Sequence, residues 1–339
     1  MFSLPDLLSH RKTHCIHVSI YCGQSKSVLR NSNSTKLITI QAAAKEPKQP
    51  WWQNVSATNC AVTDGNTGKL IFGKNATDRK EIASLTKIMT CYTVLQLAKK
   101  WNLNLKETFA EVSAFAASLE GTRAELHAGD ILSVYDLLYA MMLPSGNDAA
   151  FCLAEFFGGL LYKAKISANS HTRDSYANLF TPCKCPSKYF VFEMNENAKM
   201  LGLIQTTYTN PHGLNNIHNR STANDVGKLA AHCMKISCFK EIVGSKEYSC
   251  EGYRQCSKRT FCWKNTHMLL WKGFNGIKTG VTTNAGPCLC SSIEKNGRSL
   301  IIVLLNSRTL KSRWEETIQL STLALGALDL ENSEQRGKH

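Results

Sequence analysis

The stretch ASLTKIMT, residues 83–90, places Ser84 three residues before Lys87. Apolar residues then recur at helical spacing as far as Lys99, so the stretch is predicted to open a helix on which these two side chains are neighbours. The Ser-x-x-Lys pattern alone decides little, because it also occurs at Ser9/Lys12, Ser237/Lys240 and Ser292/Lys295. Without partners, Ser84 would be an ordinary N-cap and Lys87 a solvated residue of the first turn.

Two further signals follow in the chain. Ser145-Gly146-Asn147 lies between two predicted helices, and Lys278-Thr279-Gly280 lies on a predicted strand. Ser-x-Asn also occurs at Ser167/Asn169, whereas Lys-[Ser/Thr]-Gly occurs once. Of the four Ser-x-x-Lys sites, only the one at Ser84 opens a convincing helix with both other signals downstream in this order. The three signals together are typical of serine acyl-transferring enzymes that act on penicillin and on the peptidoglycan stem peptide.

Longer blocks around these signals resemble the serine D-alanyl-D-alanine carboxypeptidases, the low-molecular-mass penicillin-binding proteins of the β-lactamase/transpeptidase-like superfamily. The blocks are ASLTKIMT, HAGDILSVYDLLYAMMLPSGNDAA, MNENAKMLGL, NPHGL with STANDV, and GIKTGVTTNAGPCL. The resemblance covers roughly residues 54–328. It implies a peptidase that removes the terminal D-alanine of stem peptides through an acyl-enzyme on Ser84, needs neither cofactor nor metal, and is inhibited covalently by β-lactam antibiotics.

The chemistry of the serine agrees with this resemblance. A serine hydroxyl is a poor nucleophile at neutral pH and needs an adjacent base. For Lys87 to be that base, its pKa must fall from about 10.4 toward about 7–8. Burial and a second cation would lower it, and Lys278 is the candidate cation.

The other roles are implied by the resemblance. Ser145 would relay a proton toward the leaving amine, and Asn147 would orient Lys87 or hold the substrate amide. Lys278 and Thr279 would bind the terminal carboxylate of the substrate.

The resemblance also assigns roles to backbone groups. Gly280 would let an extended substrate lie against the strand edge. The oxyanion hole would consist of the backbone N–H groups of Ser84 and Val281. Val281 stands where relatives often carry an aromatic residue or histidine, and Pro287 stands where a tyrosine often follows Ala-Gly, which would alter substrate preference.

The same residues are compatible with three other interpretations. A β-lactamase shares the three signals, but the Glu-x-x-Leu-Asn type of loop that supplies a deacylating glutamate in class A enzymes is not visible. An idle descendant that only binds wall fragments or a protein would be expected to lose one of the key residues, and all are present. His212 and His218 could suggest a Ser-His-Asp triad, but Lys87 already fills the role of base. Asp130 and Asp225 are expected to cap helices or tie loops.

Composition and charge limit the classes of molecule that the protein is expected to bind. The 339 residues are 43% hydrophobic, enough to bury a large core, and carry a net charge of +14. No zinc finger, basic zipper or aromatic ribonucleoprotein motif is present, so nucleic-acid binding is not favoured, and an anionic substrate or wall-like polyanion fits the charge equally well. The absence of a run of about 18 apolar residues argues against a transmembrane helix.

The fourteen cysteines do not form a zinc pattern. Cys183/Cys185 and Cys288/Cys290 are Cys-x-Cys pairs, and the three at 250, 256 and 262 recur at a spacing of six. Buried thiols with a few disulfides are therefore expected, and no metal site is predicted.

The chain divides into segments by composition. Residues 1–50 are basic and Ser-rich and are expected to be a disordered leader. They lack the apolar region of a secretory signal and resemble an organellar transit peptide, so the compartment stays open. The catalytic domain is predicted at 54–328, with an inserted loop at 163–190 and a polar tail at 329–339.

The predicted fold class is α+β. Strands at 57–63 and 69–74 are predicted to form a hairpin around a tight turn. Helices are predicted at 86–99, from Ser133 to before Pro144, from Asn147 to Phe157, at 194–201 and at 222–234. Gly158-Gly159 is expected to end the third of these helices. Strands follow at 276–282, 287–292 and 300–306, and a helix at 314–328 closes the domain. This order predicts an antiparallel sheet flanked by N- and C-terminal helices, with a helical subdomain from the middle of the chain.

Overall fold

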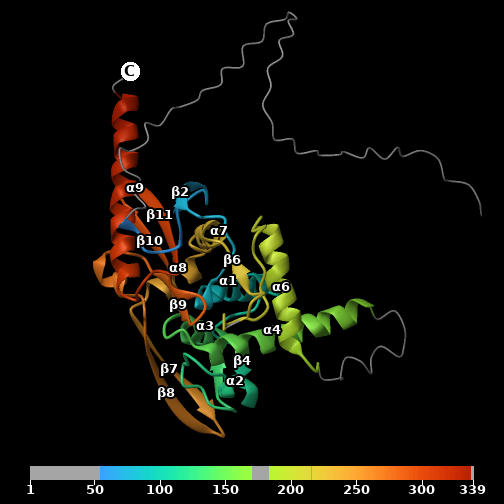
Figure 1. The fold of residues 1–339 in the computed structure, drawn as a ribbon. Coiled ribbons are helices and arrows are strands. Elements are labelled where there is room, and N and C mark those ends of the chain that lie inside the picture. The colour runs from blue at the N-terminus through green and yellow to red at the C-terminus, as the bar shows by residue number, and fades with distance from the viewer. Residues whose placement is uncertain (1–53, 170–182, 215, 337–339) are drawn as a thin grey trace, which may run out of the picture. The chain divides into compact units, whose positions relative to one another are not determined.

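The computed structural model describes residues 54–169, 183–214 and 216–336. Its main sheet is antiparallel with strand order β2-β1-β11-β10-β9 (Figure 1). The strands are β1 (Asn59–Asp64), β2 (Leu70–Lys74), β9 (Ile277–Thr282), β10 (Gly286–Lys295) and β11 (Arg298–Leu305). The predicted hairpin and the three late strands are therefore confirmed, and β9, which carries Lys278-Thr279-Gly280, is an edge strand.

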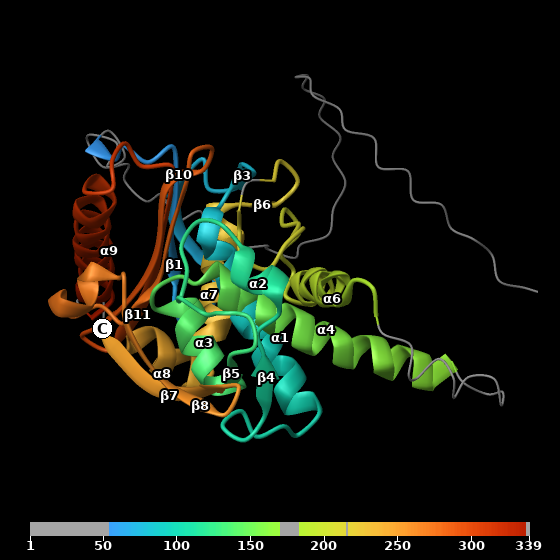
Figure 2. The same cartoon turned by 90° about the horizontal axis from the view of Figure 1, so that it is seen from below.

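Both faces of the sheet are covered by helices. Alternate residues of β11 face opposite layers: Leu300, Ile302 and Leu304 belong to the core beneath α9 (Ser312–Arg336), and Ile301, Val303 and Leu305 belong to the core shared with α1 (Thr86–Lys100) and α7 (Ala223–Cys233). Figure 2 shows the sheet between α9 and these helices. Burial on both faces explains why this strand is a continuous apolar run.

The middle of the chain forms the predicted helical region. It contains α2 (Ala114–Ser118), α3 (Val134–Met142), α4 (Asn147–Asn169), α6 (Pro186–Met200) and α8 (Ser237–Gly244). The predicted N-cap of α3 is confirmed, because the Ser133 side chain accepts a hydrogen bond from the Asp136 backbone N–H. Thr222 caps α7 in the same way, accepting from the backbone N–H of Asp225.

A second antiparallel sheet, which the sequence did not reveal, lies beside these helices. Its strand order is β4-β5-β7-β8, formed by β4 (Phe109–Glu111), β5 (Ile131–Ser133), β7 (Glu247–Arg254) and β8 (Ser257–Lys264). A two-stranded sheet pairs β3 (Lys80–Glu81) with β6 (Arg220–Ser221). Most of these strands are short, and the long hairpin of β7 and β8 is largely exposed, so neither gives a strong hydrophobic pattern.

The predicted stop at Gly158-Gly159 and the predicted loop at 163–190 are wrong in their bounds. Helix α4 continues to Asn169 and α6 begins at Pro186, so the ends of the predicted loop are helical, and residues 170–182 lie outside the described part. A Cβ atom at Gly158 would lie 2.0 Å from the Pro186 carbonyl oxygen. The glycine therefore permits close packing of α6 on α4, and it does not end the helix.

The structure bears on the prediction for the C-terminal end of the chain, and the prediction for the N-terminal end lies outside the described residues. The last helix, predicted to end at Leu328, continues to Arg336, so α9 includes most of the polar tail predicted at 329–339. The predicted leader at 1–50 lies outside the described residues. Among the helices that are described, none is long and apolar enough to cross a membrane.

The described cysteines, twelve of the fourteen, are all free thiols. The few disulfides that were expected are therefore not found in this part of the chain. Within the same residues, no group of three or more His, Cys, Asp or Glu side chains is arranged to hold a metal ion.

Candidate active site

Ser84 lies in a single 3-10 turn, η2 (Ala83–Leu85), that leads directly into α1. The Lys87 Nζ lies 2.8 Å from the Ser84 Oγ, and the Lys87 side chain is completely buried. Ala83 has a φ of 47°, in the left-handed region that costs a residue with a side chain free energy. Such strain at the residue before the serine is typical of functional sites, where the surrounding structure maintains it.

The loop between α3 and α4 brings Asn147 to the same lysine. The Lys87 Nζ donates to the Asn147 Oδ1 at 2.7 Å, and the Asn147 Nδ2 donates to the Glu120 carbonyl oxygen at 2.7 Å. These two contacts fix the orientation of the amide. Ser145 is also buried and has a φ of 69°, and its carbonyl oxygen accepts from the Thr122 hydroxyl at 2.9 Å.

A third contact to Lys87 comes from a loop that precedes β6. The Nζ donates to the His212 carbonyl oxygen at 2.8 Å, and the Ser84 hydroxyl lies 3.5 Å from the same oxygen. Lys87 thus contacts Ser84, Asn147 and His212, which come from three separate segments of the chain.

The electrostatics of the two buried lysines are unusual. Burial lowers the pKa of Lys87 well below its ordinary value, the charge of Lys278 lowers it further, and the charge of Asp148 opposes this effect. Burial, with the nearby Arg313 guanidinium, also lowers the pKa of Lys278 to about 7. The Lys278 amine can therefore change its protonation state near neutral pH. The expectation that Lys278 would depress the pKa of Lys87 agrees with this arrangement.

Strand β9 lies beside η2 and closes the site. The Lys278 Nζ donates to the Thr279 carbonyl oxygen at 3.1 Å, and the Thr279 hydroxyl is 2.8 Å from that of Thr266. Val281 is 53% exposed. A Cβ atom on Gly280 would lie 3.1 Å from the Ser84 backbone nitrogen, so the absence of a side chain permits the strand to approach η2.

The sheet register sets the direction of the backbone groups on β9. Val281 pairs with Pro287 of β10, and the Pro287 carbonyl oxygen accepts from the Ser307 N–H on the opposite side. Successive residues of an antiparallel strand direct their N–H and C=O groups to opposite sides, so Val281 forms a non-hydrogen-bonded pair with Pro287. Its N–H therefore points to the free edge of the sheet, where η2 lies.

Comparison with known proteins identifies the family of this chain. Residues 42–163 and 183–309 match the peptidase S11 family, described as D-alanyl-D-alanine carboxypeptidase. The chain belongs to this family. It is 29% identical to the D-alanyl-D-alanine carboxypeptidase DacF of Bacillus subtilis (strain 168) over 259 residues, which are 76% of this chain and 59% of that protein. It is 31% identical to the D-alanyl-D-alanine carboxypeptidase of Streptomyces sp. (strain K15), over 78% of this chain and 86% of that protein.

Solved structures give the same relationship for the fold. The Streptomyces K15 DD-transpeptidase superposes with a TM-score of 0.69 at 30% identity, covering 80% of this chain and 98% of that chain. The D-alanyl-D-alanine carboxypeptidase DacD from Francisella tularensis gives a TM-score of 0.66 at 27% identity, covering 80% of this chain and 70% of that chain. The predicted α+β, transpeptidase-like fold class is therefore confirmed.

In this carboxypeptidase-family chain, the histidines do not form a triad with Ser84. The His212 ring accepts a hydrogen bond at Nδ1 from the Leu214 N–H, and burial and Lys87 lower its pKa to about 3. Its carbonyl oxygen, and not its ring, contacts the lysine. His218 is exposed. Every residue has a backbone carbonyl group, so the sequence contains no pattern that could predict the contact between Lys87 and the His212 carbonyl oxygen.

The two aspartates that were expected to tie loops do so. The Asp225 carboxylate accepts from the Gln205 N–H at 3.0 Å and from the Thr206 hydroxyl at 2.8 Å. The Asp130 carboxylate accepts from the His127 N–H at 2.7 Å and pairs with Arg259.

The other Ser-x-x-Lys pairs have ordinary surroundings. Lys240, within α8, pairs with Glu294 on the surface, and Lys295 at the end of β10 is exposed. Ser9/Lys12 lies outside the described residues. Of these serines, Ser84 alone has a hydrogen bond to the paired lysine among the contacts of the described chain.

Sequence reasoning missed Arg313 of α9. Its Nη1 donates to the carbonyl oxygens of Gly280 and Cys288, at 3.2 and 3.1 Å. The guanidinium thus holds β9 and β10 together at the Lys-Thr-Gly segment. Arg313 lies 33 residues beyond Gly280, and only the packing of α9 on the sheet brings the two together.

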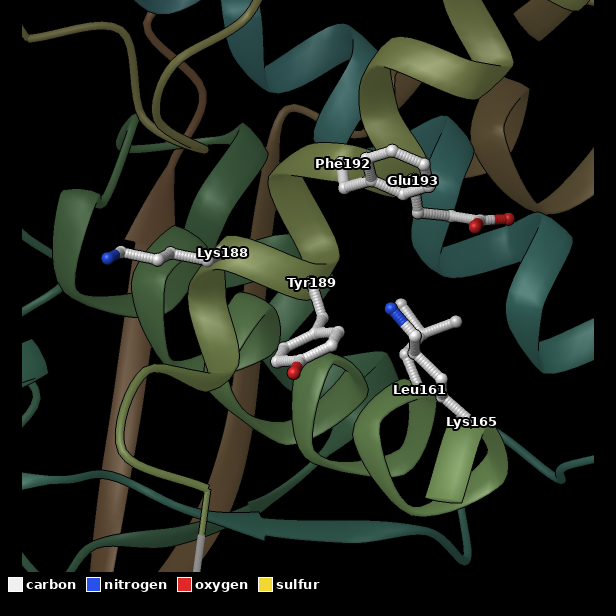
Figure 3. Close-up of a pocket in the computed structure, with 6 residues that line it drawn as sticks. All are labelled: Leu161, Lys165, Lys188, Tyr189, Phe192 and Glu193. Carbon is white, nitrogen blue, oxygen red and sulfur yellow. The ribbon is translucent and has the colours of Figure 1, made fainter. Parts of the chain in front are cut away.

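The structure also contains a cavity of about 450 Å³ between α4 and α6. Leu161 and Lys165 of α4 face Lys188, Tyr189, Phe192 and Glu193 of α6 across it (Figure 3). None of these side chains belongs to the cluster around Ser84, so the cavity is separate from the candidate active site.

Proposed function

We propose that the chain is a serine D-alanyl-D-alanine carboxypeptidase that removes the terminal D-alanine from peptidoglycan stem peptides through an acyl-enzyme on Ser84. The observation that carries this proposal is the 2.8 Å contact between the Ser84 Oγ and the Lys87 Nζ, at a buried site that lowers the pKa of the amine. Family membership and the names of the curated relatives support the same reaction.

The hydrogen bonds of Lys87 suit a neutral amine. A neutral amine has two N–H donors and one lone pair. The Asn147 Oδ1 and the His212 carbonyl oxygen can only accept, and they take the two donors. The lone pair then faces the Ser84 hydroxyl, which can donate. Lys87 is therefore the general base of this proposal.

Acylation then follows by addition to the substrate carbonyl and elimination of the terminal D-alanine. The Ser84 Oγ forms a bond with the carbonyl carbon of the penultimate residue, its proton passes to Lys87, and the bond to the nitrogen of the terminal D-alanine breaks. Ser145 relays the proton to the leaving amine. The N–H groups of Ser84 and Val281 stabilise the oxyanion, and each such donor contributes about 2.7–4 kcal/mol to lowering the barrier. Water hydrolyses the ester and releases the shortened peptide.

The free edge of β9 is the proposed docking site for the substrate backbone. An extended peptide would add to this edge as a further strand, with Gly280 allowing close approach. Lys278, in its protonated form, and the Thr279 hydroxyl would bind the terminal carboxylate. β-Lactam antibiotics, which carry a carboxylate beside a reactive amide, would acylate Ser84 in the same position.

Fluorescent penicillin tests the acylation. We expect covalent labelling of the folded protein that disappears in Ser84→Ala and persists in Ser237→Ala and Ser292→Ala, which alter serines of the same local pattern. Absence of labelling in the folded wild-type protein would contradict the proposal and favour an idle binding protein.

Release of D-alanine tests the substrate. Incubation with a diacyl-Lys-D-Ala-D-Ala peptide should release free D-alanine from the wild-type protein and none from Ser84→Ala. Rapid turnover of penicillin without D-alanine release would instead indicate a β-lactamase.

A further inference from the structure

Asp148, the second residue of α4, has a completely buried carboxylate beside the candidate active site. Its two oxygens accept hydrogen bonds from the backbone N–H groups of Ala124, at 2.9 and 3.0 Å, of Leu126, at 3.1 Å, and of Ala149, at 2.9 Å. No basic side chain of the described residues forms an ion pair with it. Burial of a charged carboxylate costs free energy unless hydrogen bonds compensate it. Because its partners here are backbone N–H groups, the carboxylate fixes the positions of the segments that supply them.

Asp148 holds residues 120–126. Three hydrogen bonds attach this segment to Ser145 and Asn147. The Asn147 Nδ2 donates to the Glu120 carbonyl oxygen, and the Asn147 backbone N–H donates to the Thr122 carbonyl oxygen at 2.8 Å. The Thr122 hydroxyl donates to the Ser145 carbonyl oxygen. Asn147 and Ser145 are therefore positioned by the same segment that the carboxylate fixes.

Two glycines show how tightly this unit is packed. A Cβ atom at Gly146 would lie 2.7 Å from the Asp148 Oδ1, and a Cβ atom at Gly121, whose φ is 84°, would lie 2.8 Å from the Asn147 Nδ2. Movement of the 120–126 segment by a few tenths of an ångström would therefore displace the amide that contacts Lys87.

We propose that Asp148 is a positioning residue for acylation: its carboxylate fixes residues 120–126, and that segment turns the Asn147 amide so that its oxygen faces Lys87. This inference rests on the proposed function. Asp148 does not contact the substrate in this scheme, and it acts through Asn147.

The charge of Asp148 gives this role a measurable signature. The charged or titratable groups that act on Lys87 are Lys278 of β9, which lowers its pKa, and Asp148 of α4, which raises it, while the His212 ring is neutral. Asp148 itself interacts with Arg123, and with the Cys152 thiol, whose pKa is raised. Removing the negative charge leaves Lys278 unopposed, so Lys87 would lose its proton at a lower pH.

Three variants test the inference. Asp148→Asn removes the charge and replaces one acceptor oxygen by a donor group that faces backbone N–H groups. Gly121→Ala displaces the Asn147 amide without changing any charge. Asp225→Asn is the control, because it alters another buried aspartate in the first turn of a helix, α7, whose carboxylate accepts hydrogen bonds from Gln205 and Thr206 and none from residues 120–126.

The rate constant for acylation by penicillin is measured across pH in each folded variant, together with the titration of Lys87 followed by NMR of ¹³C-labelled lysine. In Asp148→Asn we expect the rate constant to fall by about 10- to 100-fold, as for a misplaced catalytic group. We also expect the acid limb of the profile to move to lower pH. Gly121→Ala should lower the rate constant and leave the acid limb in place, and Asp225→Asn should match the wild type in both.

A wild-type rate in Asp148→Asn, or a lowered rate with an unmoved acid limb, would overturn the inference. If Asp148→Asn does not fold, a wild-type rate in Gly121→Ala would overturn it. Failure of the wild-type protein to react with penicillin would contradict the proposed function, whereas the Lys87 titration in Asp148→Asn would still decide whether Asp148 acts on this lysine.

Discussion

Gly280 lies against the backbone of Ser84, so that a Cβ atom added to the glycine would be 3.1 Å from the Ser84 nitrogen. The same atom would lie 3.2 Å from the Ala83 Cβ and 3.2 Å from the Ile82 carbonyl oxygen. The edge of β9 and the turn that carries Ser84 are thus in direct contact. This contact determines the separation of the two proposed oxyanion donors, the N–H groups of Ser84 and Val281.

Gly280→Ala should therefore slow acylation without unfolding the protein. The methyl group would push β9 from η2 by a few tenths of an ångström, and loss of one oxyanion donor lowers rates by about 10²–10³-fold. We expect the rate constant for acylation to fall by at least about tenfold, because the shift of β9 would weaken the hydrogen bond from one of the two oxyanion donors. Gly244→Ala is the control, since a Cβ atom there meets nothing within 4 Å. Equal rates in the two variants would show that the approach of β9 to η2 is not needed.

The pH dependence of substrate binding should report the protonation of Lys278. The pKa of this buried amine is lowered to about 7, so the fraction that carries a positive charge falls as the pH rises through that value. A peptide with a free terminal carboxylate should therefore bind less tightly at higher pH, with KM rising by at most about tenfold per pH unit.

Two comparisons make this prediction specific. Lys278→Arg keeps its charge at all accessible pH values and should move the alkaline limb to higher pH. A peptide with a C-terminal amide should show no such limb. A KM that is constant between pH 6 and 9 for the free carboxylate would argue against Lys278 as its binding partner.

Lys278 should also lower the stability of the folded protein. Its pKa is about 7 in the folded state and about 10.4 when unfolded, so the unfolded state binds more protons between these values and wild-type stability rises with pH in this window. Lys278→Met, with a side chain of similar shape, should raise the free energy of unfolding by a few kcal/mol at pH 7. The gain should shrink as the pH increases toward 10.

Urea unfolding of both proteins at pH 7 and pH 9 measures this effect. A variant that is less stable than the wild type at both values would mean that the lysine is stabilised by contacts that outweigh its burial.

The two adjacent glycines of α4 should respond in opposite ways to the same substitution. Gly158→Ala places a methyl group 2.0 Å from the Pro186 carbonyl oxygen and should destabilise the protein by about 1–3 kcal/mol, as overpacking does. A Cβ atom at Gly159 meets nothing within 4 Å, so Gly159→Ala should stabilise the helix by about 0.5–1 kcal/mol. Thermal unfolding of the pair checks this, and similar changes in both variants would contradict the close packing of α6 on α4.

Sequence patterns predicted the parts of this protein that depend on local order. The hairpin of β1 and β2, the N-cap of α3 and the buried strand β11 follow from turn residues, capping residues and runs of apolar side chains, and the structure confirms each of them. The three short motifs and their order indicated the family, which the comparisons confirm.

The residues that surround those motifs could not be found in the same way. Propensity alone would end α4 at Gly158, yet the helix continues and α6 packs closely against this glycine at Pro186. The contribution of His212 is a backbone carbonyl, which any residue carries, and Arg313 and Asp148 reach the site from α9 and α4 through the tertiary packing.

The amino-acid sequence by itself thus determined the fold class and supplied Ser84, Lys87, Ser145, Asn147 and the Lys-Thr-Gly strand as candidates. Only the tertiary structure decided which groups surround Lys87 and how far they lower its pKa. The physical reason is that burial and charge act through space: Lys278 and Asp148 lie far from Lys87 in the chain, and their opposing effects exist only when the helices and β9 enclose the amine together.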